Sequence, residues 1–142
     1  GNVIGGGDWS EDRLIPDAAR SVINRRPLLI RNPGSTRPWQ HVLECLRGYL
    51  LLAEGLLKGE KELATAFNFG PGPQDNVAVE QLLSRLKPYW TNLTWTVEAN
   101  RETLTRHESK FLYLDSSLAR KQLGWTPYWS LETGLAKTGQ LL

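Results

Sequence analysis

The sequence contains no methionine and a single cysteine, Cys45. One cysteine excludes an internal disulfide and a metal site built from thiolates, and it is typical of a reducing compartment such as the cytoplasm. We interpret Cys45 as a small hydrophobic residue buried on a helix. Because translation starts with methionine, we expect the chain to be a piece of a longer polypeptide.

Long hydrophobic runs and an excess charge of one sign are also missing. No segment approaches the about 20 consecutive apolar residues of a membrane helix, and the first residues lack the features of a signal peptide. The 17 Lys and Arg face 15 Asp and Glu, which gives a net charge of +2. We therefore expect a soluble, cytoplasmic protein without a membrane or nucleic-acid partner, and any anion-binding site has to be local.

Motifs of nucleotide and metal chemistry are missing as well. The glycines at 5–7 do not complete G-x-G-x-x-G because position 10 is Ser10, and G-x-x-x-x-G-K does not occur, which excludes a phosphate loop. We interpret these glycines as a turn with close backbone approach at a strand end. His41 and His107 lack carboxylates or thiolates at ligand spacing, so no metal site is predicted, and we expect His41 to be a hydrogen-bonded structural residue.

The composition fits one globular domain of 142 residues with 40% hydrophobic residues. Apolar spacing predicts helices at 14–26, 42–57, 77–88 and 118–123 and a last helix from Ser130, with Asp75 or Asn76 capping the third. Strands are predicted at the N-terminus and at 28–30, 66–70 and 93–99. Apolar residues around most of the 42–57 helix predict that it is largely buried. The pattern indicates an α/β or α+β fold with an incomplete sheet.

Several arginines lie at predicted strand ends or in loops. The guanidinium group suits phosphate because its planar fork donates two parallel hydrogen bonds, and α/β folds bind ligands at strand ends. Any one of them could equally be a surface charge, but their joint placement indicates a diphosphate site. These residues are Arg13, Arg31, Arg37, Arg101 and Arg106.

Five blocks of sequence carry a family resemblance. They are "NVIGGGDW" (2–9), "RLIPD" (13–17), "RPWQHVLECLRGYLLLAE" (37–54), "FNFGPG" (67–72) and "LDSSLARKQLGWTP" (114–127). In this order they resemble the C-terminal half of extended short-chain dehydrogenases that act on nucleotide sugars, most closely the CDP-glucose 4,6-dehydratases. The resemblance implies the C-terminal substrate-binding portion of an extended Rossmann-type, NAD(P)-binding enzyme, with residues 1–9 as the tail of the Rossmann sheet and the earlier strands missing.

The resemblance also implies an activity for the complete protein. Enzymes of this family hold NAD in an N-terminal domain, oxidise the sugar at C4, eliminate water across C5 and C6, and return the hydride to C6. It implies a lyase with CDP-glucose as substrate and NAD as cofactor, a role in lipopolysaccharide O-antigen biosynthesis, and a homodimer. An epimerase or decarboxylase of the same superfamily and a non-catalytic interaction module are the alternatives.

The resemblance also implies roles for individual residues. Asn2, Arg13 and Arg37 would hold the diphosphate, and Val3 would lie near the nicotinamide of NAD. The family's Y-x-x-x-K pair and glycine fingerprint are absent, so the resemblance implies no catalytic residue here and an inactive isolated chain. The loop around 107 lacks the family's Arg-Pro-Gly pattern. The other implied nucleotide contacts are Leu14, Ile15, Leu28, Ile30, Asn76, His107 and Glu108.

Overall fold

The structure is a computed structural model of the chain, and it describes residues 2–98 and 110–140. None of the helices within these ranges is long and apolar enough to cross a membrane. The helices are α1 (Leu14–Ile23), α2 (Val42–Leu57), α3 (Val79–Leu86), α4 (Ser117–Leu123) and α5 (Leu131–Gly139), with short 3-10 helices η1 (Lys61–Leu63) and η2 (Pro73–Asp75). The strands are β1 (Asn2–Ile4), β2 (Leu28–Ile30), β3 (Thr36–His41), β4 (Asn76–Ala78) and β5 (Trp95–Val97).

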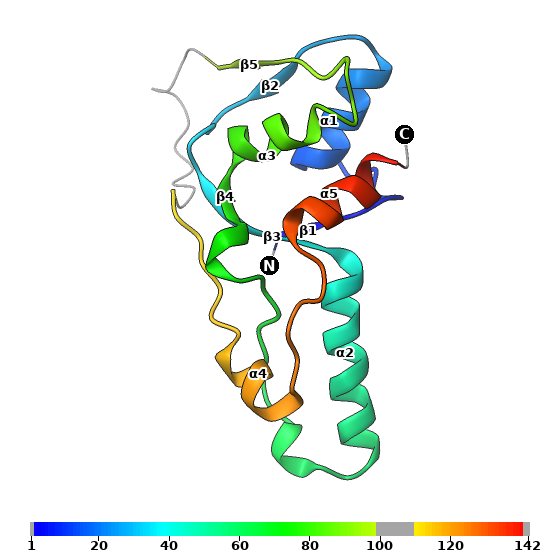
Figure 1. The fold of residues 1–142 in the computed structure, drawn as a ribbon, viewed down its shortest axis with the longest axis vertical. Coiled ribbons are helices and arrows are strands. Elements are labelled where there is room, and N and C mark those ends of the chain that lie inside the picture. The colour runs from blue at the N-terminus through cyan, green and yellow to red at the C-terminus, as the bar shows by residue number, and fades with distance from the viewer. Residues whose placement is uncertain (1, 99–109, 141–142) are drawn as a thin grey trace.

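Two small sheets organise the fold (Figure 1). In the first, β3 is the central strand: it runs parallel to β1, with Asn2 opposite Trp39, and antiparallel to β4, with Arg37 opposite Val77. In the second, β2 and β5 are parallel. The expected mixture of helices and short strands is confirmed.

The hydrophobic residues are divided between two clusters. The larger one packs α1, α3 and α5 around β1–β4, and the smaller one, with Cys45, Phe69, Ala119 and Trp125, lies between α2 and α4. Figure 1 shows α2 and α4 extending away from the end of the molecule that carries β2 and β5. Cys45 is buried on α2, as expected.

The prediction that α2 is largely buried is wrong for the described structure. Its inward face carries Glu44, Cys45, Gly48 and Gly55, whereas Leu50 is 70% exposed. One face is enough for the contacts that α2 makes with α4 and η1. In the described structure the outward face is therefore an exposed apolar surface, which we call the α2 outer face and define by Leu43, Leu46, Leu50 and Leu57.

Several predicted boundaries also differ from the structure. The first helix ends at Ile23, and the third begins at Val79 because residues 76–78 pair with β3. Asp75 and Asn76 therefore do not cap it, and the Ala78 amide instead donates to Gln81 Oε1 at 3.1 Å. The predicted strand at 66–70 has no strand partner in the described part of the chain. Phe69 within it packs edge-on against Trp125, with ring centroids 5.2 Å apart.

Candidate functional site

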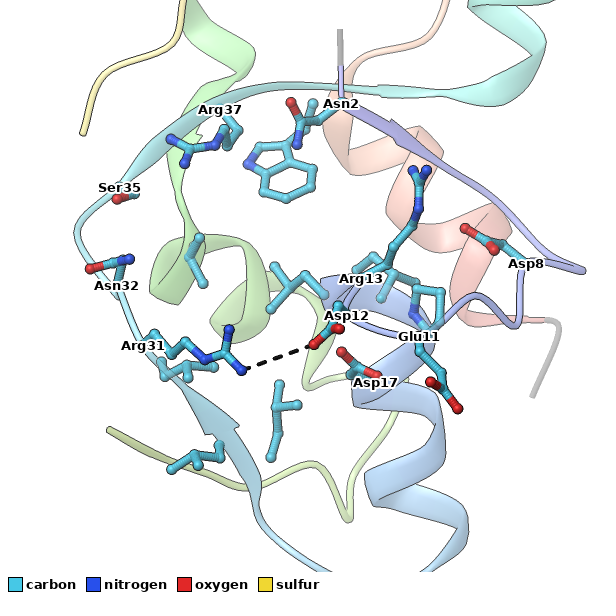
Figure 2. A pocket seen from close by; sticks show the side chains of 18 of the residues that line it. Asn2, Asp8, Glu11, Asp12, Arg13, Asp17, Arg31, Asn32, Ser35 and Arg37 are labelled. Atoms are coloured by element: carbon cyan, nitrogen blue, oxygen red, sulfur yellow. Dashed lines mark ion pairs between the residues drawn. The ribbon is translucent and has the colours of Figure 1, made fainter. Parts of the chain in front are cut away.

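A pocket of about 670 Å³ opens between α1 and the strands β2 and β3 (Figure 2). One wall is the loop at 8–13 with the first turn of α1, and the other is β2 with the segment that leads into β3. Asn2, Val3 and Trp39 from β1 and β3 close one end. Its volume lies within the range of about 300–1,000 Å³ that is typical of small-molecule sites.

Residues that the sequence assigned to ligands gather in this pocket although they are far apart in the chain. They come from β1, the start of α1, β2 and β3, so the pocket exists only once these elements have packed together. The assigned residues that line it are Asn2, Val3, Arg13, Leu14, Ile15, Leu28, Ile30 and Arg37.

Arg37 lies on β3 and is only 7% exposed. The expectation that Arg37 lies at a strand end or in a loop is wrong, because its backbone pairs with Val77 across the β3–β4 ladder. Its Nη1 donates to the Thr36 carbonyl at 2.8 Å. Ser35 and Trp39, two residues to either side, line the same pocket, as the two-residue period of a strand requires.

Arg13 lies on the opposite wall, at the N-terminus of α1 (Figure 2). It is the N-cap residue and its carbonyl accepts from the Asp17 amide at 2.9 Å, but its side chain makes no capping hydrogen bond. Within the described residues the guanidinium group forms no hydrogen bond. Arg13 is exposed, so its donors are available to a ligand in the pocket.

The glycine turn before Arg13 has the structural role that we expected. A Cβ on Gly5 would lie 2.9 Å from Val42 Cγ1, which indicates close approach of the backbone to the start of α2. Gly7 has a φ of +81°, in the left-handed region that glycine tolerates best. The turn brings the chain from the end of β1 to the pocket wall.

Carboxylates line the pocket beside the arginines. Arg31 Nη2 lies 3.9 Å from Asp12 Oδ1, and this ion pair spans the pocket in Figure 2. The Ser10 amide donates to Asp8 Oδ1 at 3.0 Å, and this bond lowers the pKa of Asp8. An anion would therefore be selected by the directed donors of the arginines and not by a positive net charge. The lining carboxylates are Asp8, Glu11, Asp12 and Asp17.

The floor of the pocket is apolar. Ile15 on α1 and Leu28 and Ile30 on β2 are buried and belong to the larger hydrophobic cluster. The backbone of β2 pairs with β5, and the Leu28 amide donates to the carbonyl of Thr94, just before β5, at 2.8 Å. A buried apolar floor beside polar walls suits a ring with polar edges, such as a nucleobase.

The other assigned residues lie elsewhere. Asn76 on β4 does not line the pocket, and its Oδ1 is buried without a hydrogen-bond partner among the described residues. His107 and Glu108 lie outside the described residues. Sequence reasoning gave no site role to Ser35 or Trp39, which do line the pocket. Their alternation with Arg37 was the available signal.

His41 has the structural role expected from the sequence. Its Nδ1 accepts from the Leu43 amide at 3.3 Å and caps α2, and its ring packs at 4.9 Å from that of Trp129. Burial lowers the pKa of His41, which favours the neutral ring that this acceptor role requires.

Metal and dinucleotide chemistry find little support among the described residues. No group of three or more His, Cys, Asp or Glu that could hold a metal ion occurs in the part of the chain that the structure describes. The sequence has no glycine fingerprint, and Val3 is the single residue assigned to NAD. We therefore assign no chemical step to NAD at this pocket.

The chain matches no established family profile. It is 44% identical over 138 residues to CDP-glucose 4,6-dehydratase of Salmonella typhimurium, and this match covers 96% of the chain and 38% of that protein. The resemblance to the nucleotide-sugar dehydratases is confirmed. The chain corresponds to a C-terminal portion of CDP-glucose 4,6-dehydratase and spans well under half of its length.

Several solved structures share the fold of this chain. An epimerase of Methanothermobacter thermautotrophicus superposes with a TM-score of 0.79 at 23% identity, over 99% of the chain and 40% of the epimerase. UDP-glucuronic acid 4-epimerase of Bacillus cereus, solved with NAD and a fluorinated UDP-sugar, gives 0.77 at 20% identity, over 99% of the chain and 42% of the epimerase. At these identities the matches establish the fold.

Proposed function

We propose that the chain is the nucleotide-sugar-binding portion of an NAD-dependent 4,6-dehydratase that acts on CDP-glucose. The observation that carries this proposal is the convergence of Asn2, Arg13 and Arg37 from separate elements on one pocket of about 670 Å³. The 44% identity to CDP-glucose 4,6-dehydratase supports the choice of reaction. The complete protein would convert CDP-glucose to CDP-4-keto-6-deoxyglucose as a cytoplasmic homodimer, in lipopolysaccharide O-antigen biosynthesis.

In this proposal the diphosphate lies between the two walls. Arg13 and Arg37 donate from opposite sides and Asn2 donates from the closed end. The pyrimidine lies on the apolar floor formed by Leu28 and Ile30. A hydrogen bond to a charged group contributes about 1.5–3 kcal/mol, so removing either arginine should be measurable in the affinity. Asn76, His107 and Glu108 remain proposed contacts.

The cofactor is proposed to bind to a portion of the protein outside this chain. Residues 1–9 would belong to its parallel sheet, and two observations support this assignment. Within the described residues, β1 has a strand neighbour, β3, on one side only. The α2 outer face is apolar, and Leu57 on it is 90% exposed. The open edge of β1 can pair with a further strand, and the apolar face of α2 can pack against a further layer of the protein.

Direct titration with nucleotides tests the binding site. Calorimetric titration of the complete protein with CDP, UDP and dTDP should give binding heat with CDP. Arg13→Ala should weaken CDP binding by about 10- to 100-fold, since about 1.4 kcal/mol corresponds to a factor of ten. Arg13 is the better first variant because it is exposed, whereas Arg37 is buried and its loss could disturb β3. Arg26→Ala is the matched control, because Arg26 is exposed and does not line the pocket.

Two results would count against the proposal. One is the absence of binding heat with all three nucleotides, and the other is an unchanged CDP affinity in Arg13→Ala. Product analysis after incubation with CDP-glucose distinguishes a 4-keto-6-deoxy product from a C4 epimer. The epimerases among the solved relatives do not decide between these reactions, because a likeness at their identities concerns the fold alone.

A further inference from the structure

The loop at 8–13, which forms one wall of the pocket, is fastened by a residue that does not line the pocket. Arg20 lies on α1, and its Nη1 donates to the Trp9 carbonyl at 2.8 Å. Its Nη2 donates to the Ser10 carbonyl at 2.9 Å and forms an ion pair with Asp17. We call this set of contacts the Arg20 clamp.

The clamp is the main attachment of this loop to α1. The other hydrogen bond within residues 8–12 is that of the Ser10 amide to Asp8, which is internal to the loop. Asp12 forms a 3.9 Å ion pair with Arg31, and Asp8 interacts electrostatically with Arg13 and Arg20. Asp12 has a φ of +58°, in the left-handed region that a non-glycine residue occupies only when its surroundings hold it there. On the α1 side, Arg20 holds the neighbouring residues Trp9 and Ser10.

The geometry of the guanidinium group explains why an arginine performs this task. Its planar fork reaches two successive carbonyls while the Asp17 carboxylate, one helical turn earlier, holds the fork in place. Lysine carries a single ammonium group on a flexible stem and cannot reproduce this fork. The side chains of Arg20 and Asp17 are 30% and 34% exposed, so the clamp lies at the surface and outside the hydrophobic core.

Arg13 lies between the clamped loop and the helix. As the N-cap residue it has an extended backbone, with φ −119° and ψ 133°, and the direction of its side chain depends on how the chain enters α1. The chain enters α1 from the loop, and Arg20 holds this loop at Trp9 and Ser10, a few residues before Arg13. Preorganised donors bind a ligand more tightly than mobile ones because less ordering is paid for on binding.

We propose that Arg20 is a positioning residue for diphosphate binding and that it acts through Arg13. The proposal rests on the proposed function of the pocket. It also assigns a second effect to Arg20: the guanidinium group compensates the charge of Asp17, which lines the pocket and would otherwise repel a diphosphate. Salt separates the two effects, because it screens repulsion between exposed charges but does not restore geometry.

A double-mutant cycle on the complete protein tests this coupling. CDP affinity is measured by calorimetry for wild type, Arg20→Ala, Arg13→Ala and the double variant, at low and high salt. Arg20→Ala should weaken CDP binding by about 10-fold, and part of the loss should persist at high salt. At high salt the double variant should bind no more weakly than Arg13→Ala, since both substitutions then remove the same contact. Arg20→Lys should lie between wild type and Arg20→Ala.

Controls separate positioning from general damage. Cytidine has no phosphate, so wild type and Arg20→Ala should bind it with equal affinity. Arg26 is exposed and has no side-chain partner in the described structure, so Arg26→Ala should bind CDP like wild type. If Arg20→Ala does not fold by circular dichroism, Arg20→Lys takes its place in the cycle.

Each outcome has a distinct meaning. If wild type does not bind CDP, the proposed function fails. If wild type binds CDP and Arg20→Ala binds it equally well, the positioning role is overturned while the proposed function stands. Losses that add in the double variant at high salt, or an equal loss of cytidine binding, would also overturn the positioning role.

Discussion

Replacing Glu44 by alanine should destabilise the fold strongly, because this carboxylate joins α2 to the segment before α5. Glu44 is 4% exposed, and its two oxygens accept from the Tyr128 amide at 2.9 Å and the Trp129 amide at 3.1 Å. Its own carbonyl accepts from Trp125 Nε1 at 3.1 Å. Glu44→Ala removes both side-chain acceptors and leaves two partly buried amides without partners.

The expected magnitude follows from these two amides. Leaving a buried donor without a partner costs about 1–3 kcal/mol, so the free energy of unfolding should fall by about 2–6 kcal/mol. In urea, with a slope of about 2 kcal/mol/M, the unfolding midpoint should fall by about 1–3 M. Equilibrium unfolding followed by far-ultraviolet circular dichroism measures this shift. Glu44→Gln retains one acceptor oxygen and should fall between wild type and Glu44→Ala.

Glu54, on the same helix, provides a control for the Glu44 prediction. Glu54 bonds to Lys58 at 2.6 Å, but both side chains are at least 60% exposed. Breaking such a surface pair costs less than about 1 kcal/mol. If Glu44→Ala and Glu54→Ala shift the urea midpoint equally, the reasoning about buried amides is refuted.

Three further predictions concern stability. Burial lowers the pKa of His41 below 6.5, so the unfolded chain binds the proton more readily and the free energy of unfolding should decrease as the pH falls through 6.5. The variant His41→Asn can still accept from the Leu43 amide, and urea titrations should show that it reduces this pH dependence. Burial raises the pKa of Asp75 above 3.8, so the charged side chain destabilises the fold at pH near 7 and Asp75→Asn should raise the melting temperature there. The variant should also lack the stabilisation that wild type gains from this group as the pH falls toward 3.8. An unchanged melting temperature at pH near 7 would contradict this. Gly48→Ala would place a Cβ 2.4 Å from the Phe69 ring and should cost about 1–3 kcal/mol in thermal unfolding, and a stabilised variant would contradict the clash.

Local patterns predicted the elements whose formation depends on their own residues. The helix at 42–57 has the predicted bounds, and the apolar run at 28–30 is a strand as predicted. Gly124, directly after the predicted helix, ends α4 in the left-handed conformation that glycine favours at this position. In each case the periodicity or the stop signal lies within the segment itself.

Elements that depend on a distant partner were not predictable in this way. Pro38 and its polar neighbours give β3 no alternating pattern, and its strand conformation comes from pairing with β1 and β4. Conversely, 66–70 alternates like a strand but has no strand neighbour in the described structure. The pocket shares this dependence: the family resemblance suggested roles for Arg13 and Arg37, but only packing of α1 against β2 and β3 brings them to one cavity.

The tryptophans differ in exposure, and this difference can be measured by fluorescence quenching. Trp39, Trp90 and Trp125 are each 5% exposed or less, and each indole N–H donates to a backbone carbonyl. Trp9, in contrast, is 59% exposed on the loop that Arg20 holds. A soluble quencher such as iodide would therefore reach the emission of Trp9 well before that of the three interior indoles. The accessibility of the Trp9 indole to the quencher would therefore record movement of the loop at 8–13 without any attached dye.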